Sequence, residues 1–263
     1  MNRQTFGTVS PRERRQADHF FADLLGTGMS PGRGWRGGAG ESADEATDAE
    51  LRRQRLDLLG RITQADLYWH DIPLVNGFRI RVSSPLRKDD LFVPGTATES
   101  LALARRFEVF PLTRAVADQT HNAAIKVDYS ERRRPPTLSD FVAFSSALNA
   151  TPYGTSYGYA LASGQHKWWV ISSRGPVINY GFYIRRNRTD PVRCGRYADA
   201  KYNVIQSLGG RHDGGHWDYS QLFQFMTALR DENGQPVDLR EALLNRHPAV
   251  WDETAAPAAS SLP

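Results

Sequence analysis

The 263-residue chain has little cysteine, little lysine and no long apolar run. Its single cysteine, Cys194, excludes an intrachain disulfide framework and a zinc site built from several cysteines. No stretch of about 18 apolar residues is present, so no membrane association is expected. The N-terminal residues lack the apolar core of a secretory signal. The sequence therefore predicts a soluble protein, cytoplasmic as synthesised, which could be exported by a non-Sec route or released by lysis.

Lysine is scarce, with four residues against 29 arginines, and the formal net charge is +4. This charge is smaller than that of most dedicated nucleic-acid-binding proteins, so no specific nucleic-acid partner is predicted. Arginine pairs bidentately with carboxylates and phosphates, but the codon choice of a GC-rich genome explains the same bias. Hydrophobic residues make up 40% of the chain and aromatic residues 11%, which is enough for a sizeable core.

Composition divides the chain into four parts. Residues 1–25 contain a predicted helix that begins with a capping sequence at Ser10 to Glu13 and could dock on another surface. Residues 26–47 are rich in glycine and are predicted to form a flexible linker. Residues 48–252 are predicted to form a single domain, and residues 253–263 a disordered tail.

The element pattern predicts an α+β fold, with a helical N-terminal part followed by a strand-rich, mainly antiparallel C-terminal half. Helices are predicted over residues 48–61, 96–107, 112–127 and 139–150, with a last helix that starts at Asp238. Strands are predicted over residues 78–84, 166–173, 176–186, 201–208 and, less distinctly from a helix, 222–226. The strands over 166–173 and 176–186 would pair as a hairpin.

The predicted helix over 112–127 has Thr113 as its N-cap. Ala117, His121 and Ala124 fall on one face of this helix. A single histidine on an apolar face is more typical of a core residue than of a ligand, so His121 is interpreted as structural.

Polar chemistry concentrates in residues 211–221, RHDGGHWDYSQ, between two predicted strands. Loops at strand ends often carry functional sites. His212 and His216 are four residues apart, but two glycines between them argue against a helix, so the zinc-binding H-E-x-x-H pattern does not apply. A loop could still bring both imidazoles to one ion, with Asp213 or Asp218 as an oxygen donor. We nevertheless predict no metal and no cofactor.

Several further interpretations of this segment remain open. His212, tuned by Asp218, could act as a general acid–base group. Ser220 with the same pair would form a nucleophilic triad, although no G-x-S-x-G elbow surrounds it. Cys194 with His212 would form a Cys–His pair. In the structural interpretation, the aspartates and histidines hold a glycine-rich loop together and Tyr219 is a buried anchor.

The predicted hairpin carries two more candidates, Lys167 and Tyr180. A lysine just before a buried strand either binds a substrate anion or is an ordinary edge residue. Regular alternation along the second strand places Tyr180 on the face opposite Tyr183. Aromatic strands of this kind suit a sugar-binding surface, and they are equally ordinary in a core.

From about Phe78 onward, the order of these pieces resembles a family of uncharacterised bacterial proteins. The shared motifs are a Gly-x-x-Lys strand, a Tyr-Gly strand, an Ile-Gln-x-Leu strand and a His-x5-Asp-Tyr-Ser segment. The residues that carry the resemblance are Lys167, Tyr180, Gly181, Gln206, His212, Asp218, Tyr219 and Ser220. His216 and Cys194 do not belong to the pattern. The family brings no activity, but its members are often exported or joined to cell-wall-binding modules, which implies a cell-wall target.

Together these features predict a hydrolase-like enzyme that acts on a bacterial cell-wall or other polymeric substrate, such as a polysaccharide or peptidoglycan. His212 would be the acid–base group, oriented by Asp218, with Ser220 beside it. Lys167 and Tyr180 would contact substrate or a developing negative charge.

Two other functions fit the same sequence. One is a non-catalytic component of a phage or contractile-injection particle, docked into a protein assembly through residues 1–25. The other is a carbohydrate-binding module that uses the aromatic strands. An enzyme requires His212, Lys167 and Asp218 to converge on one cleft, whereas a binding module requires exposed, coplanar aromatic rings.

Overall fold

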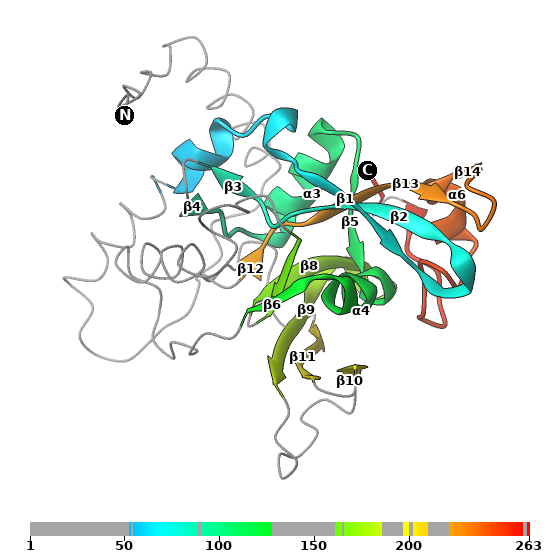
Figure 1. Ribbon diagram of the computed structural model, residues 1–263. Helices are drawn as coiled ribbons and strands as arrows, with labels where there is room; N and C mark the ends of the chain where they lie inside the picture. Colours follow the sequence, from blue (N-terminus) through cyan, green and yellow to red (C-terminus); the bar gives the residue numbers. More distant parts are fainter. Residues whose placement is uncertain are drawn as a thin grey trace, which may run out of the picture.

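The computed structural model describes residues 53, 55–88, 91–127, 161–164, 166–185, 197–199, 202–209, 221–259 and 262–263 (Figure 1). The predicted N-terminal helix and linker, and the helix expected over 139–150, lie outside these residues. In the described part, helices accompany a large mixed sheet whose strands are mostly antiparallel, so the protein is α+β.

The helical elements are η1 (Gln64–Asp66), η2 (Val75–Gly77), α3 (Ala97–Arg106), α4 (Arg114–Ala123) and α6 (Leu239–Leu244), together with residues 55–60. The strands of the large sheet are β1 (Trp69–Pro73), β2 (Arg79–Ser83), β5 (Phe110–Thr113), β8 (Lys167–Ser172), β9 (Gly175–Arg185), β10 (Tyr197–Asp199), β11 (Tyr202–Gly209), β12 (Gln221–Leu222), β13 (Phe225–Arg230) and β14 (Pro236–Val237). Two small ladders consist of β3 (Arg87–Lys88) with β4 (Leu91–Phe92), and β6 (Ile125–Val127) with β7 (Ala162–Gly164).

The ten-stranded sheet has the order β1-β2-β13-β5-β8-β9-β11-β10, with β12 beside β8 and β14 beside β13. β5 and β12 both run parallel to β8, and β12 pairs with the first two residues of β8 whereas β5 pairs further along. The other neighbours in this sheet are antiparallel. Strands are not confined to the C-terminal half, since β1 and β2 precede α3.

The two central helices begin where the sequence predicts. The Thr113 hydroxyl accepts a hydrogen bond from the Val116 amide at 3.2 Å and donates one to the Val250 carbonyl at 2.6 Å. The cap therefore starts α4 and also ties it to the C-terminal segment. α3 has a complete capping box, in which Thr96 and Glu99 each satisfy an amide of the other.

The predicted helix over 112–127 is too long, because α4 ends at Ala123. Ala124 has an extended backbone, and Ile125 to Val127 pair in parallel with β7 instead. Two β-branched residues favour this strand, and a pairing partner distant in the chain overrides the helical pattern. The predicted strand over 222–226 is likewise two strands, β12 and β13, separated by residues 223 and 224.

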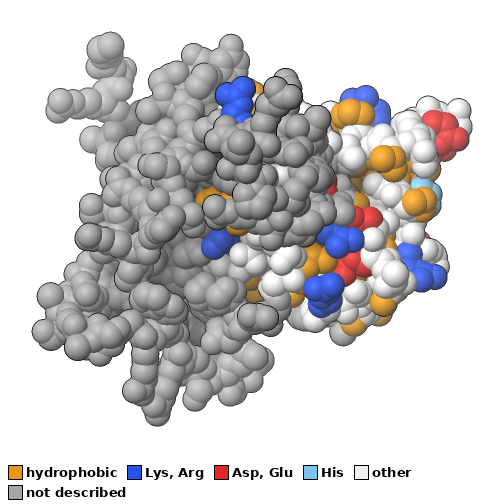
Figure 2. All heavy atoms as spheres, turned by 90° about the horizontal axis from the view of Figure 1, so that it is seen from below, with side chains coloured by type: hydrophobic (Ala, Val, Ile, Leu, Met, Phe, Trp, Pro, Cys, Tyr) orange, Lys and Arg blue, Asp and Glu red, His pale blue; other side chains and the backbone are white. Residues whose placement is uncertain are grey.

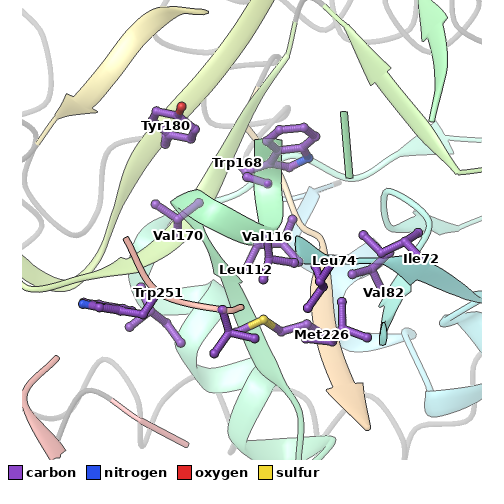
Figure 3. Packing of buried hydrophobic residues seen from close by; sticks show 14 of the residues in the cluster. Ile72, Leu74, Val82, Leu112, Val116, Trp168, Val170, Tyr180, Met226 and Trp251 are labelled. Carbon is purple, nitrogen blue, oxygen red and sulfur yellow. The ribbon is translucent and has the colours of Figure 1, made fainter. Parts of the chain in front are cut away.

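Among the described residues, the buried hydrophobic side chains form two clusters. One lies between the sheet and α4, where Leu112 of β5, Val116 of α4 and Met226 of β13 belong to the same cluster (Figure 3). The second contains Trp169 of β8 and Phe225 of β13, together with residues of α3. β8 thus contributes neighbouring tryptophans to two different cores, as a buried strand with a period of two requires.

The C-terminal residues pack against the rest of the protein, in contrast to the expected disordered tail. Leu262 is buried in the first cluster, and the Arg240 guanidinium donates to the Pro263 carbonyl at 2.6 Å. The Glu253 carboxylate accepts hydrogen bonds from the hydroxyls of Ser172 and Ser173, each at 2.9 Å. Composition did not predict that these residues pack against the protein, because a single leucine and several polar contacts hold them in place.

A buried ion pair connects residues 55–60 to the start of α3. The Arg55 guanidinium donates to both Glu99 carboxylate oxygens, at 2.6 and 2.9 Å, and Arg55 is only 2% exposed. Leu58 and Leu59 on the same helical segment are buried. In the part of the chain that the structure describes, no helix is long and apolar enough to cross a membrane.

Candidate functional site

β8 and β9 form the antiparallel hairpin that the sequence predicts. Lys167 pairs with Gly181, Trp168 with Tyr180, and Trp169 with Asn179. Side chains alternate along β8, and directly opposed residues point to the same side. One side, which we call the α4 face, carries Trp168 and Tyr180 and packs against α4. The other side, which we call the Lys167 face, carries Lys167, Trp169 and Asn179.

A shared carboxylate organises the α4 face. The hydroxyls of Tyr180 and Tyr183 both donate to Oδ1 of Asp118 on α4, each at 2.8 Å. The prediction that these tyrosines lie on opposite faces is therefore wrong. The reason is a local change in the backbone of β9, which we call the β9 kink: Gly181 has φ 111° and Phe182 has φ 60°, although β9 keeps its register with β8 and β11 at these residues.

The β9 kink depends on glycine at position 181. A Cβ there would lie 3.2 Å from the Trp168 ring and 3.3 Å from the Tyr183 ring, and positive φ is unfavourable for other residues. The amide of Phe182 donates to the His166 carbonyl at 2.8 Å, which ties the kink to the start of β8.

Gly181→Ala is expected to lower the free energy of unfolding by about 2 kcal/mol, from backbone strain together with crowding of two rings. Urea denaturation followed by tryptophan fluorescence measures this. Gly234→Ala is the matched control, because Gly234 has φ 78° with nothing within 4 Å of its added Cβ. It should cost about 1 kcal/mol from strain alone, and an equal loss in both variants would contradict the crowding argument.

Two buried histidines complete the α4 face. The His121 ring stacks on Tyr183 with ring centroids 3.9 Å apart, and its Nδ1 lies 2.7 Å from the Ser163 hydroxyl oxygen. His166 lies edge-on to Trp168 at 5.0 Å. The interpretation of His121 as a core residue is confirmed, since it is 0% exposed.

Burial determines the charge of both rings. Desolvation lowers the pKa of His121 to about 2, and the nearby Lys126 and His166 add to this shift. Desolvation lowers the pKa of His166 to about 3. Neither His166 nitrogen has a hydrogen-bond partner among the described residues. Both imidazoles are therefore neutral at pH 7, which suits packing and hydrogen bonding better than proton exchange with a substrate.

The Lys167 face has a different character. Lys167 is half-buried, and its parallel neighbour Gln221 on β12 is fully buried. Asn179 is 1% exposed, and its Oδ1 has no hydrogen-bond partner among the described residues. An ammonium group and two buried amides thus lie on the neighbouring strands β8, β9 and β12, and groups of these kinds hydrogen-bond to polar partners.

The loop before α3 supports this face. The Trp169 indole donates to the Gly95 carbonyl at 2.6 Å, and the Gly95 amide donates to the Gln221 carbonyl at 3.0 Å. The approach requires glycine, because a Cβ on Gly95 would lie 1.9 Å from the Phe223 ring and 2.8 Å from a Glu99 carboxylate oxygen. Gln221, and with it the edge beside Lys167, is therefore held by the α3 region.

Three of the five predicted site residues, His212, Asp218 and Ser220, lie outside the described residues, as does Cys194. The described residues on either side of His212, Asp218 and Ser220 show where this segment begins and ends. It ends at Gly209, which pairs with Asn179 on β9, and resumes at Gln221, which pairs with Lys167 on β8. The ends of the segment that carries the His-x5-Asp-Tyr-Ser motif are therefore anchored beside two residues of the Lys167 face.

The other two predicted site residues are described, and they lie on opposite faces of the hairpin. Lys167 is on the Lys167 face, whereas Tyr180 is buried on the α4 face with its hydroxyl on Asp118. Sequence reasoning missed Asp118, although its spacing of three from His121 places both on one side of a helix. It also missed Gln221, because a two-residue strand has no recognisable period.

Comparisons with protein-family models, curated proteins and solved structures find no match. Among the described residues, no group of three or more histidine, cysteine, aspartate or glutamate side chains could hold a metal ion. On the described part of the face seen from below, charged side chains of both signs are scattered among hydrophobic ones (Figure 2). The proposed function therefore rests on the chemistry of the residues at the Lys167 face and not on similarity to known proteins.

Proposed function

We propose that the protein is a hydrolase-like enzyme whose acid–base site lies at the Lys167 face and that acts on a polymeric substrate such as the bacterial cell wall. The observation that supports this is the anchoring of residues 210–220. Gly209 pairs with Asn179 and Gln221 pairs with Lys167. Both ends of the segment richest in catalytic residue types therefore lie beside a lysine and a buried amide.

In this proposal His212 is the acid–base group and Asp218 fixes its tautomer and orientation. His212 accepts a proton from water while the water oxygen bonds to the carbon of the scissile bond. The bond to the leaving group then breaks, and the leaving group takes the proton from His212. The Lys167 ammonium stabilises the negative charge that develops on the substrate, and Ser220 provides a hydroxyl beside Gln221.

His212→Ala is expected to lower the hydrolysis rate by about 10²–10⁴-fold, because the proton transfer loses its positioned group. Lys167→Met should lower it on the order of 10²-fold through lost charge stabilisation. His216→Ala should leave the rate nearly unchanged. The assay is turbidity loss of purified cell walls with release of soluble fragments, and circular dichroism checks the fold of each variant.

Three results would contradict the proposal. One is a folded His212→Ala protein with full activity on a substrate that the wild type cleaves. Another is a His212→Ala protein that unfolds, because the histidine would then hold the segment together rather than transfer a proton. The third is an equal loss in His212→Ala and His216→Ala, which would point to a shared structural or metal-binding role instead.

A further inference from the structure

We propose that Asp118, Tyr180 and Tyr183 are positioning residues that act on Lys167 from the opposite face of the sheet. The inference deepens the proposed function and rests on it for the role of Lys167 as a substrate-binding group. It also assigns Tyr180 a different task from the substrate contact that the sequence predicts. The carboxylate acts on the β9 kink, the kink on Lys167, and the start of β8 on β12.

The first step is the shared acceptor. Tyr180 and Tyr183 are three positions apart on β9, so a regular strand would point them to opposite faces. Both hydroxyls nevertheless reach the same oxygen of Asp118, which is buried. Hydrogen bonds to an acidic side chain are among the stronger ones inside proteins. Satisfying both requires the positive φ values at Gly181 and Phe182, so the carboxylate stabilises the β9 kink.

The second step connects the β9 kink to β8. Gly181 pairs directly with Lys167, and the Phe182 amide donates to the carbonyl of His166, the residue before Lys167. Trp168, the residue after it, has its ring 5.3 Å from that of Tyr183. The kink and its aromatic neighbours thus hold the backbone on both sides of Lys167.

The third step connects Lys167 to the return of the chain. Gln221 pairs with Lys167 and Leu222 with Trp168, a contact of only two residues. So short a strand has little stability of its own, and its position depends on the start of β8 on one side and on the loop before α3 on the other. Through β8, Asp118 therefore influences both Lys167 and the position of Gln221.

The chain is well suited to a direct test, because it contains only four lysines. The full-length protein is treated briefly with a small amine-acylating reagent, and mass spectrometry measures the labelling of each lysine. Lys88 is the internal reference, since its Nζ lies 3.0 Å from both carboxylate oxygens of Asp66, on a different ladder. The Tyr180→Phe/Tyr183→Phe double variant keeps both rings and removes both hydroxyls.

We call the labelling of Lys167 divided by that of Lys88 the Lys167 ratio. In the double variant, this ratio is expected to change on the order of threefold, because the local backbone loosens. Hydrogen exchange at the Phe182 amide should accelerate with it. Ser83→Ala is the matched control. It removes a buried hydrogen bond from the Phe225 amide at 3.0 Å, on another part of the sheet, and should lower stability without altering the Lys167 ratio.

An unchanged Lys167 ratio in the double variant, or an equal change in Ser83→Ala, would overturn the inference. If the double variant does not fold, Tyr180→Phe alone is tested in the same way. Asp118→Asn retains an acceptor oxygen and should give a Lys167 ratio closer to wild type than Asp118→Ala does. Labelling needs no substrate, so the two proposals can fail separately. A changed Lys167 ratio in the double variant, combined with full activity of His212→Ala, would contradict the proposed function and leave the positioning role intact.

Discussion

Lowering the pH from 7 to 4.5 is expected to cost the folded protein about 5 kcal/mol of stability, from His121 and His166 together. Burial lowers their pKa values to about 2 and about 3, from an ordinary value of 6.5. Between pH 6.5 and these lower values, the unfolded chain binds two protons that the folded protein does not. Stability is therefore complete above pH 6.5 and falls as the pH decreases, by about 1.4 kcal/mol per unit for each histidine.

Urea denaturation at several pH values between 7 and 4.5 measures this loss. His121→Gln and His166→Gln each remove one titrating group, so each should make the acid dependence shallower by about 1.4 kcal/mol per pH unit. Ser163→Ala is the control, because it removes the hydroxyl beside His121 and leaves both rings in place. It should lower stability at every pH without changing the slope. A double histidine variant with the wild-type slope would contradict the explanation.

Arg55→Ala is expected to lower the free energy of unfolding by about 3–5 kcal/mol, because it leaves the Glu99 carboxylate buried without its cation. Arg55 holds both oxygens of Glu99, and its guanidinium also lies 3.5 Å from the Pro94 carbonyl. Urea denaturation followed by circular dichroism measures the loss. A change below about 1 kcal/mol would show that the pair behaves like an exposed one.

A double variant separates the lost charge from the lost packing. Arg55→Met/Glu99→Gln removes both charges, keeps an apolar side chain at position 55 and retains an acceptor for the Thr96 amide. It should be more stable than Arg55→Ala, because neither partner is left as a buried unpaired charge. The exposed ion pair of Arg61 with Asp57 is the matched comparison, and Arg61→Ala should cost less than about 1 kcal/mol.

The local sequence determined the elements whose signals lie within a few residues. Thr113 caps α4 as predicted, and Asp238, the predicted start of the last helix, caps α6, since in each case a side-chain oxygen reaches an amide three positions ahead. The β8–β9 hairpin follows from two aromatic, β-branched runs around a short turn. The burial of His121 follows from its apolar helix face.

Tertiary contacts decided where those elements meet and which faces they present. Tyr180 and Tyr183 share a face through the β9 kink, and both donate to Asp118 on a distant element, a carboxylate that no alternation pattern in β9 contains. Gln221 lies beside Lys167 through a two-residue parallel pairing that has no sequence period. Capping and alternation are encoded by neighbours in the chain, whereas a shared acceptor and a parallel register depend on residues that only folding brings together.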